Sequence, residues 1–126
     1  MNFPSDLKYD KEHTWLKVLD NNEALVGITE FAQSELGEIV YVDLPSTGAH
    51  FNKDEVFGSV EAVKTTSDLF MPVSGDILEV NKILLNKAEL VNSASYTEGW
   101  MIKVKLTDAT ELNELLSSGA YQTLVL

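Results

Sequence analysis

The apolar residues of this chain are gathered in short segments, each broken after a few residues by turn-forming residues. Residues 15–18 and 24–28 flank an Asp20-Asn21-Asn22 turn, and this arrangement predicts a β-hairpin. Further strand-like segments are rich in β-branched and aromatic residues and occupy 38–44, 56–63, 68–71, 77–80 and 102–106. This succession of short strands predicts a mostly β fold.

One short helix is expected between two of these strands. Thr29 precedes residues 30–36 in the N-cap position, and Gly37 stands where a helix commonly stops. Residues 83–92 leave the choice between helix and strand open. The pattern therefore predicts a helix inserted into a β domain.

The C-terminal stretch changes to a helical period. Asp108 and Glu111 have the spacing of a capping box, and Gly119 lies where we expect the helix to end. Three apolar residues would share one face of this helix: Leu112, Leu115 and Leu116. We therefore expect a C-terminal helix that ends at Gly119.

The length and the charge limit what this domain can be. A chain of 126 residues fits one domain, residues 1–126, with a single core. No apolar run approaches the roughly 20 residues needed to cross a bilayer, and residues 1–6 do not resemble a secretory signal, so we expect a cytoplasmic protein without a membrane partner. The net charge of −11 would repel phosphate backbones, which argues against nucleic acid as a partner.

The sequence lacks the residues that most enzymes need. Without cysteine there are no disulfides, thiol nucleophiles or cysteine metal sites, so any sulfur redox chemistry must come from an added group. His13 and His50 are far apart and have no partners at metal-ligand spacing, so we expect no metal site. No nucleotide-binding loop or nucleophile elbow is present. A carrier or binding role is favoured over catalysis.

Lys64 is a rare positive charge in an acidic region. Between Val18 and Asn81 there are twelve acidic residues and only two lysines, Lys53 and Lys64. Lys64 falls between two strand-like segments, so we expect it at the tip of a hairpin. A lysine acylated there would carry a long flexible arm on a rigid domain. By itself, however, the position favours an ordinary solvated lysine, the commonest role of a single lysine in a turn.

The residues around Lys64 form a longer motif. Residues 58–64 read Gly-Ser-Val-Glu-Ala-Val-Lys, and 72–75 read Pro-Val-Ser-Gly. This stretch resembles the lipoyl-attachment region of the glycine cleavage system H proteins. Further matches to that family occur, in the same order, at 7–9, 13–15, 26–33, 36–45, 89–92 and 99–104. The resemblance implies that lipoic acid is attached covalently to Lys64, and that Glu61 and Gly75 help a lipoylating enzyme to recognise the chain.

The resemblance also implies a fold and a function. The fold would be a lipoyl/biotinyl-type barrel-sandwich hybrid with a short inserted helix and a C-terminal helix. The chain would be a non-catalytic carrier in glycine catabolism and one-carbon metabolism. We expect a monomer, because a carrier must present its arm freely to several enzymes. It would take the aminomethyl group of glycine from the pyridoxal-phosphate glycine decarboxylase (P protein) to the folate-dependent aminomethyltransferase (T protein), and dihydrolipoyl dehydrogenase (L protein) would reoxidise it. Lipoate would be attached by a lipoate ligase or by an octanoyl/lipoyl transferase.

The family's cleft for the loaded arm is where this sequence departs most. In the family, a glutamate between the histidine and the tryptophan of a His-Glu-Trp motif helps to hold the arm, together with an aspartate four residues after the lysine. Here Thr14 stands at the glutamate position, and Asp68 occupies the aspartate position. Asp68 could pair with a protonated amine on the arm. Glu12 lies two residues before Thr14, so on a strand it would face the same side and could substitute.

Three other functions remain possible from the sequence. An H-like protein could serve other enzymes as a lipoyl donor or redox carrier, and the attachment motif does not separate this role from glycine cleavage. A biotin carrier shares the fold, but biotin domains usually place methionine on both sides of the lysine, where this chain has Val63 and Thr65. A small hydrolytic enzyme would need a catalytic set that we do not find.

Overall fold

Two antiparallel sheets and three short helices make up the computed structural model, which describes all residues, 1–126. The larger sheet has the strand order β1-β2-β3-β9-β8-β5, and the smaller one has the order β4-β6-β7. The strands are β1 (Lys8–Tyr9), β2 (Thr14–Val18), β3 (Glu23–Ile28), β4 (Ile39–Asp43), β5 (His50–Phe51), β6 (Val56–Ala62), β7 (Thr66–Phe70), β8 (Gly75–Val80) and β9 (Ile102–Leu106). The helices are α1 (Glu30–Leu36), α2 (Leu90–Ser93) and α3 (Ser118–Val125). The prediction of a mostly β fold with short helices is confirmed.

The local predictions in the first third of the chain are confirmed as well. β2 and β3 form the expected hairpin, and Asn21 and Asn22 both adopt the positive φ that such a turn requires. α1 begins where the N-cap predicts, because the Thr29 side chain accepts a hydrogen bond from the backbone N–H of Ala32. It ends at Gly37, whose φ of 85° is strained for any residue with a side chain.

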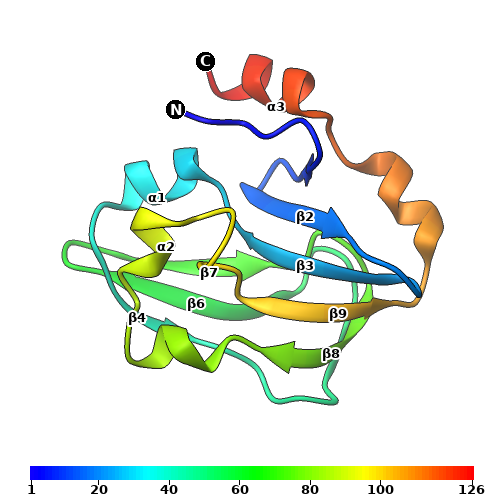
Figure 1. Ribbon diagram of the computed structural model, residues 1–126, viewed down its shortest axis with the longest axis horizontal. Helices are drawn as coiled ribbons and strands as arrows, with labels where there is room; N and C mark the ends of the chain where they lie inside the picture. The colour runs from blue at the N-terminus through cyan, green and yellow to red at the C-terminus, as the bar shows by residue number, and fades with distance from the viewer.

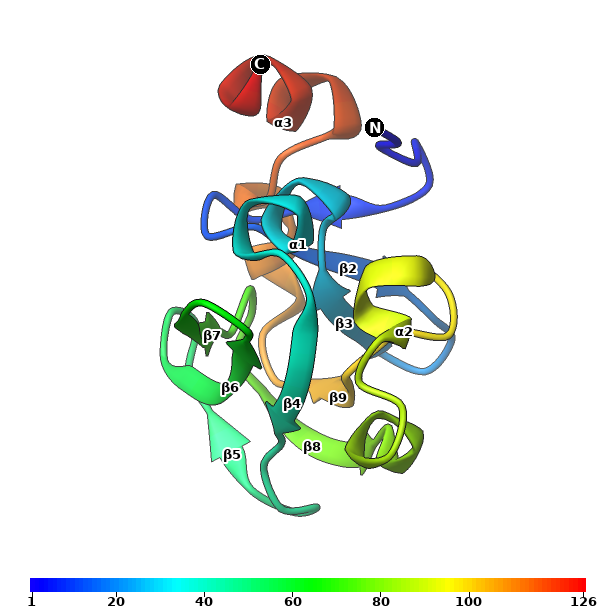
Figure 2. The same cartoon turned by 90° about the vertical axis from the view of Figure 1, so that its left-hand side faces the viewer.

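The hydrophobic core has one large part and one small part. Twenty buried residues from both sheets and from the segment around α2 form the main cluster. A separate cluster holds the N-terminal strand and the C-terminal helix together and consists of Leu7, Tyr9, Trp15 and Tyr121. Figure 2 shows α3 and the first residues of the chain side by side above β2. The two chain ends are therefore attached to the sandwich by their own small core.

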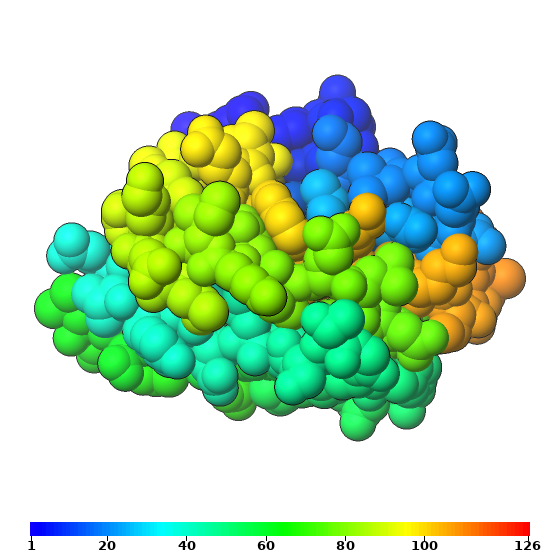
Figure 3. Space-filling view, turned by 60° about the horizontal axis from the view of Figure 1, so that its bottom comes forward, coloured from blue at the N-terminus to red at the C-terminus, as the bar shows by residue number.

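The segment between β8 and β9 covers one side of the molecule. Residues 83–92, for which the sequence left helix and strand both open, fall in a 3-10 helix (Lys82–Leu85), a connecting loop and α2. In the space-filling view this segment, drawn in yellow-green and yellow, lies directly on the turquoise residues of α1 and β4 (Figure 3). None of the helices has the length and apolar character needed to cross a membrane.

The prediction of one helix ending at Gly119 is wrong. The stretch forms a 3-10 helix (Ala109–Glu114), and Leu116 is then extended and exchanges two backbone hydrogen bonds with Tyr9. The Glu111 carboxylate does not complete a capping box, because it accepts hydrogen bonds from the backbone N–H and the hydroxyl of Ser74. A new helix, α3, starts after the N-cap Ser117 and contains Gly119 in its first turn. Contacts with distant residues thus override the local helical pattern.

Candidate functional site

Lys64 lies at the tip of the β6–β7 hairpin, as predicted. The two strands pair from Val56↔Phe70 to Glu61↔Thr66, and the backbone N–H of Ala62 donates to the carbonyl of Thr65 at 2.7 Å to close the turn. Lys64 is exposed, and none of the salt bridges in the structure involves it. The amine is therefore free for modification at one end of the molecule.

A series of hydrogen bonds connects this hairpin tip to α2. The Asn92 side chain donates to the carbonyl of Gly37 at 2.9 Å and accepts from the backbone N–H of Ile39 at 2.8 Å. Between these two residues, the carbonyl of Glu38 accepts from the N–H of Val63, next to Lys64, at 3.0 Å. Asn92 lies on α2, far in sequence from the hairpin, so α2 helps to fix the position of the Lys64 turn through residues 37–39.

The stem of Lys64 leans over the C-terminal end of α1. A Cβ atom built on Gly37 would lie 3.5 Å from Cε of Lys64 and 3.9 Å from its Nζ. Glycine at this position leaves room for the lysine stem as well as allowing the positive φ. The lysine stem therefore lies beside the C-terminal end of α1, and Leu36, the residue before Gly37, lines the neighbouring cavity.

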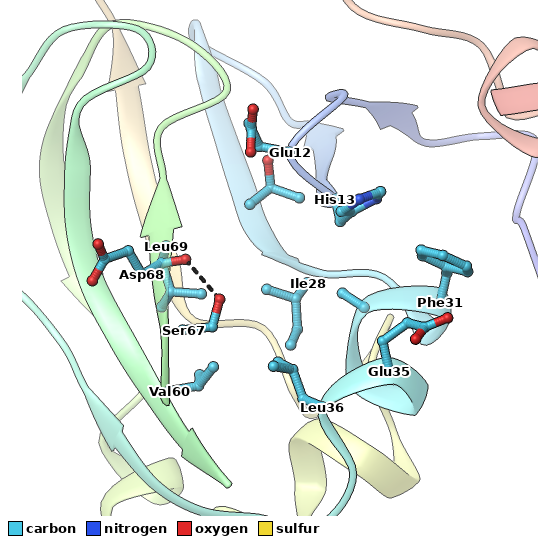
Figure 4. Close-up of a pocket in the computed structure, with 12 residues that line it drawn as sticks. Glu12, His13, Ile28, Phe31, Glu35, Leu36, Val60, Ser67, Asp68 and Leu69 are labelled. Carbon is cyan, nitrogen blue, oxygen red and sulfur yellow. Dashed lines mark hydrogen bonds between the residues drawn. The ribbon is translucent and has the colours of Figure 1, made fainter. Parts of the chain in front are cut away.

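A cavity of about 260 Å³ lies between α1 and the strands that face it (Figure 4). Ile28, Leu36, Val60 and Leu69 give it an apolar floor, and polar residues surround them. Its volume is below the roughly 300–1,000 Å³ of pockets for drug-sized ligands, which suits a single slender chain. All three predicted cleft residues line it: Glu12, Thr14 and Asp68.

The three cleft residues contribute in different ways. Glu12 is not on a strand as expected, because residues 10–13 form a turn in which the Asp10 carboxylate accepts from the N–H of Glu12. Thr14 is 1% exposed, and its hydroxyl has no hydrogen-bond partner. In Figure 4 the Asp68 carboxylate points away from the cavity while Ser67 and Leu69 point toward it, as strand alternation requires. Of the three cleft residues, Thr14, at the family's glutamate position, is the one whose buried hydroxyl has no hydrogen-bond partner.

The comparison with known families decides to which family the chain belongs. A model of the family described as "Glycine cleavage H-protein" matches residues 7–126. The chain belongs to this family. It is 54% identical over 126 residues to the glycine cleavage system H protein of Prosthecochloris aestuarii, with 99% of this chain and 98% of the relative covered. The H protein of one strain of Staphylococcus epidermidis is 50% identical over 125 residues at the same coverage.

A solved structure agrees with the family assignment. The crystal structure of a glycine cleavage system H protein from Mycobacterium marinum has a TM-score of 0.88 and 34% sequence identity, and it covers 95% of this chain and 96% of its own. The fold prediction and the recognition of the H-protein family are both confirmed. This chain is accordingly a non-catalytic lipoyl carrier of the glycine cleavage system, and its family carries covalently bound lipoate.

The residues at the site fit a lipoyl group. A lipoylated lysine is a long apolar chain with one amide and a terminal sulfur ring, so it needs an apolar groove within reach of the lysine. The stem of Lys64 over Gly37, the apolar cavity floor along α1 and the unpaired Thr14 hydroxyl meet this need. No group of three or more His, Cys, Asp or Glu residues is placed to hold a metal ion.

Glu61 and Gly75 lie at different ends of the hairpin. Glu61 is exposed three residues before Lys64, on the outer face of the smaller sheet. Gly75 is buried at the start of β8, after β7 has run away from the Lys64 turn for roughly 17 Å, judged from five residues at about 3.3 Å each. In Figure 1 the β6–β7 turn is at the left and β8 starts at the right. The structure brings Glu61, but not Gly75, close to Lys64.

Sequence reasoning missed several residues of the cavity wall. His13 lines the cavity, and its ring packs in a tilted arrangement against that of Phe31, with the centroids 5.1 Å apart. The face of α1 formed by Phe31, Ala32, Glu35 and Leu36 also lines the cavity. The i, i+4 spacing of these four residues could have predicted a shared wall, since it places them on one face of the predicted helix.

Titration of His13 gives the site a pH-dependent contribution to stability. Burial lowers the pKa of His13 below its usual value, and the carboxylates of Glu12, Asp10 and Glu35 act in the opposite direction. Because the unfolded chain then binds more protons, stability falls as the pH drops below about 6.5 and is complete above it. We expect His13→Asn to remove this part of the dependence, since asparagine tolerates the φ of 71° found at this position.

Urea unfolding of both proteins at about pH 5 and about pH 7.5 tests this expectation. The gain in stability between the two pH values should be larger for the wild type than for His13→Asn. His50 titrates in a similar range, with a pKa raised by hydrogen bonds to Asp76 and Asn52, but it is present in both proteins and cancels in the comparison. Equal gains for the two proteins would contradict the assignment to His13.

Proposed function

We propose that Lys64 is the residue that carries lipoate. The lipoyl arm then moves the aminomethyl group of glycine from the P protein to the T protein, after which the L protein reoxidises the arm. The position of Lys64 supports this proposal, because the lysine is exposed at a hairpin tip and its stem lies beside the C-terminal end of α1, a helix that lines an apolar cavity. When bound, lipoate supplies the disulfide that accepts the one-carbon unit and the electrons. The chain, which has no cysteine, adds no thiol of its own.

We propose different roles for the two recognition residues. Glu61 is exposed beside the modified turn, so a lipoate ligase or an octanoyl/lipoyl transferase can contact it while acting on Lys64. Gly75 is buried, and a Cβ there would lie 2.7 Å from the carbonyl oxygen of Lys105 on β9. Its contribution to lipoylation is therefore indirect, through the packing of β8 against β9.

The cavity is proposed to shelter the loaded arm from water. Its apolar floor suits the hydrocarbon part of the arm, and the Thr14 hydroxyl gains a partner when a polar group of the arm reaches it. Glu12 supplies a carboxylate at the mouth of the cavity for an amine. Asp68 faces the outer side of β7, so a change of its rotamer is needed before it can share this role.

The cellular setting proposed for the chain is simple. A carrier that presents one arm to three enzymes in turn needs a free hairpin tip, and a monomer keeps it free. The absence of cysteine is compatible with a reducing compartment, and we propose the cytoplasm.

Exchange of bicarbonate with the carboxyl group of glycine tests the function. We expect the lipoylated chain to support this exchange when it is mixed with competent P protein, and the unlipoylated chain to give no exchange above background. The departure at Thr14 favours one alternative, an H-like lipoyl donor for other enzymes. Lipoylated protein that supports no exchange but passes its lipoyl group to another acceptor would replace the proposed function with that alternative.

A further inference from the structure

The C-terminal helix reaches the cavity through a single hydroxyl group. Tyr121, on α3, is fully buried, and its hydroxyl lies 2.8 Å from Nδ1 of His13 and 2.8 Å from Oγ1 of Thr29. We infer that Tyr121 is a positioning residue, which sets the cavity for the loaded arm by joining two of its walls. This inference rests on the proposed use of the cavity by the arm.

The first wall is the turn that carries Glu12, His13 and Thr14. His13 has a φ of 71°, a left-handed conformation that is uncommon for residues other than glycine and needs support from its surroundings. The N–H of His13 donates to the carbonyl of Asp10, but the imidazole ring has only Tyr121 as a hydrogen-bond partner. The hydroxyl of Tyr121 therefore fixes the ring orientation of a residue that lines the cavity.

The second wall is α1, and Thr29 controls where this helix begins. Oγ1 of Thr29 accepts from the N–H of Ala32, so it caps the helix that carries the lining residues Phe31 and Leu36. The Thr29 hydroxyl is shared between this cap and Tyr121. A shift of Tyr121 would thus change the first turn of α1 together with the position of His13.

Tyr121 itself is held firmly from the other side. Its ring stacks on that of Tyr9 with centroids 4.8 Å apart and an angle of 8°, and Phe3 contacts its edge at 5.8 Å. α3 is fixed in turn by the backbone pairing of Tyr9 with Leu116, just before the helix begins. The small core of Leu7, Tyr9, Trp15 and Tyr121 joins α3 to the first residues of the chain, which lie together at the top of Figure 2, and it holds the Tyr121 hydroxyl group in place.

The protonation states of His13 and Tyr121 allow the Tyr121 hydroxyl to form both of its hydrogen bonds. Burial lowers the pKa of His13 and raises that of Tyr121, so the imidazole and the phenol are both neutral at neutral pH. The phenol has one proton to donate and accepts one in return, either from the Thr29 hydroxyl or from the imidazole. Both hydrogen bonds can therefore form at once without any charge.

The variant Tyr121→Phe, with Tyr9→Phe as its matched control, tests the inference. Both tyrosines are fully buried in the same ring stack, and the Tyr9 hydroxyl bonds only to the carbonyl of Pro4, away from the cavity. In unlipoylated protein we expect Tyr121→Phe to shift the ¹⁵N signals of the His13 ring and to speed hydrogen exchange at the Ala32 amide about two- to tenfold. Tyr9→Phe should do neither.

The loaded protein supplies the second measurement. We expect lipoylation of Tyr121→Phe at the wild-type rate, because Lys64 lies on another element, and loss of the amine cargo in the absence of T protein about two- to tenfold faster. Unchanged His13 signals and Ala32 exchange would overturn the inference, and so would altered signals with an unchanged rate of cargo loss. Failure of the proposed function would look different, since wild-type protein would then support no glycine exchange at all.

Discussion

Lys64→Arg is expected to fold normally and to carry no lipoate. The guanidinium group stays protonated at any pH that proteins tolerate, so it cannot attack an activated acyl group as a lysine amine can. Because Lys64 is exposed and has no salt-bridge partner, the free energy of unfolding should change by less than about 0.5 kcal/mol. Intact mass after growth with lipoate should show the lipoyl increment for the wild type only, and glycine exchange should fall to background.

Lys82→Arg is the matched control for this prediction. Lys82 is also exposed and starts the 3-10 helix after β8, but it belongs to no hairpin tip. We expect Lys82→Arg to gain the full lipoyl mass and to support exchange like the wild type. A lipoyl increment that persists in Lys64→Arg would show that another lysine is modified and would contradict the assignment.

The parts of this fold that the sequence predicted well are those that depend on neighbouring residues. The β2–β3 hairpin depends on Asn21 and Asn22, and α1 depends on the cap at Thr29 and the stop at Gly37. The Lys64 hairpin follows from two strand patterns on either side of a polar tip. In each of these cases, the hydrogen bonds that define the element are made within a few residues of one another.

The parts that the sequence could not predict depend on distant contacts. Glu111 bonds to Ser74 instead of capping a helix, and the pairing of Leu116 with Tyr9 forces an extended backbone where a helical face was expected. The link from Tyr121 to His13 spans 108 positions. No local pattern signals such contacts, because they exist only once the sandwich has brought the chain ends together.

In the candidate site too, some residues could be placed from local sequence and others depend on distant contacts. Lys64 and Glu61 could be placed from their motif, since both lie on one hairpin. The motif placed Asp68 in the cleft, but strand alternation puts its side chain on the opposite face from Leu69, so its carboxylate points away from the cavity. The position of Gly75 required the register of the larger sheet, in which Gly75 pairs with Leu106. Motif distance along the chain therefore gave no guide to distance in space at this residue.

Gly75→Ala is expected to destabilise the protein strongly. The new Cβ would lie 2.7 Å from the carbonyl oxygen of Lys105 and 3.4 Å from Cβ of Val104. β9 cannot move aside cheaply, since it pairs with β3 on its other edge. We expect a loss of about 2–3 kcal/mol in the free energy of unfolding, and a fall in Tm of roughly 10 °C. Thermal and urea unfolding of the unlipoylated protein measure both.

Gly119→Ala is the control for the change of residue type. A Cβ at Gly119 meets nothing within 4 Å, and alanine is the better helix former, so α3 should be unchanged or slightly stabilised. At a temperature where Gly75→Ala is still folded, we expect its lipoylation rate to stay within about twofold of the wild type, because its fault lies in packing far from the modified turn. Slow lipoylation with an unchanged Tm would instead mean that the lipoylating enzyme contacts Gly75 directly, and that its recognition surface extends from the hairpin tip to the start of β8.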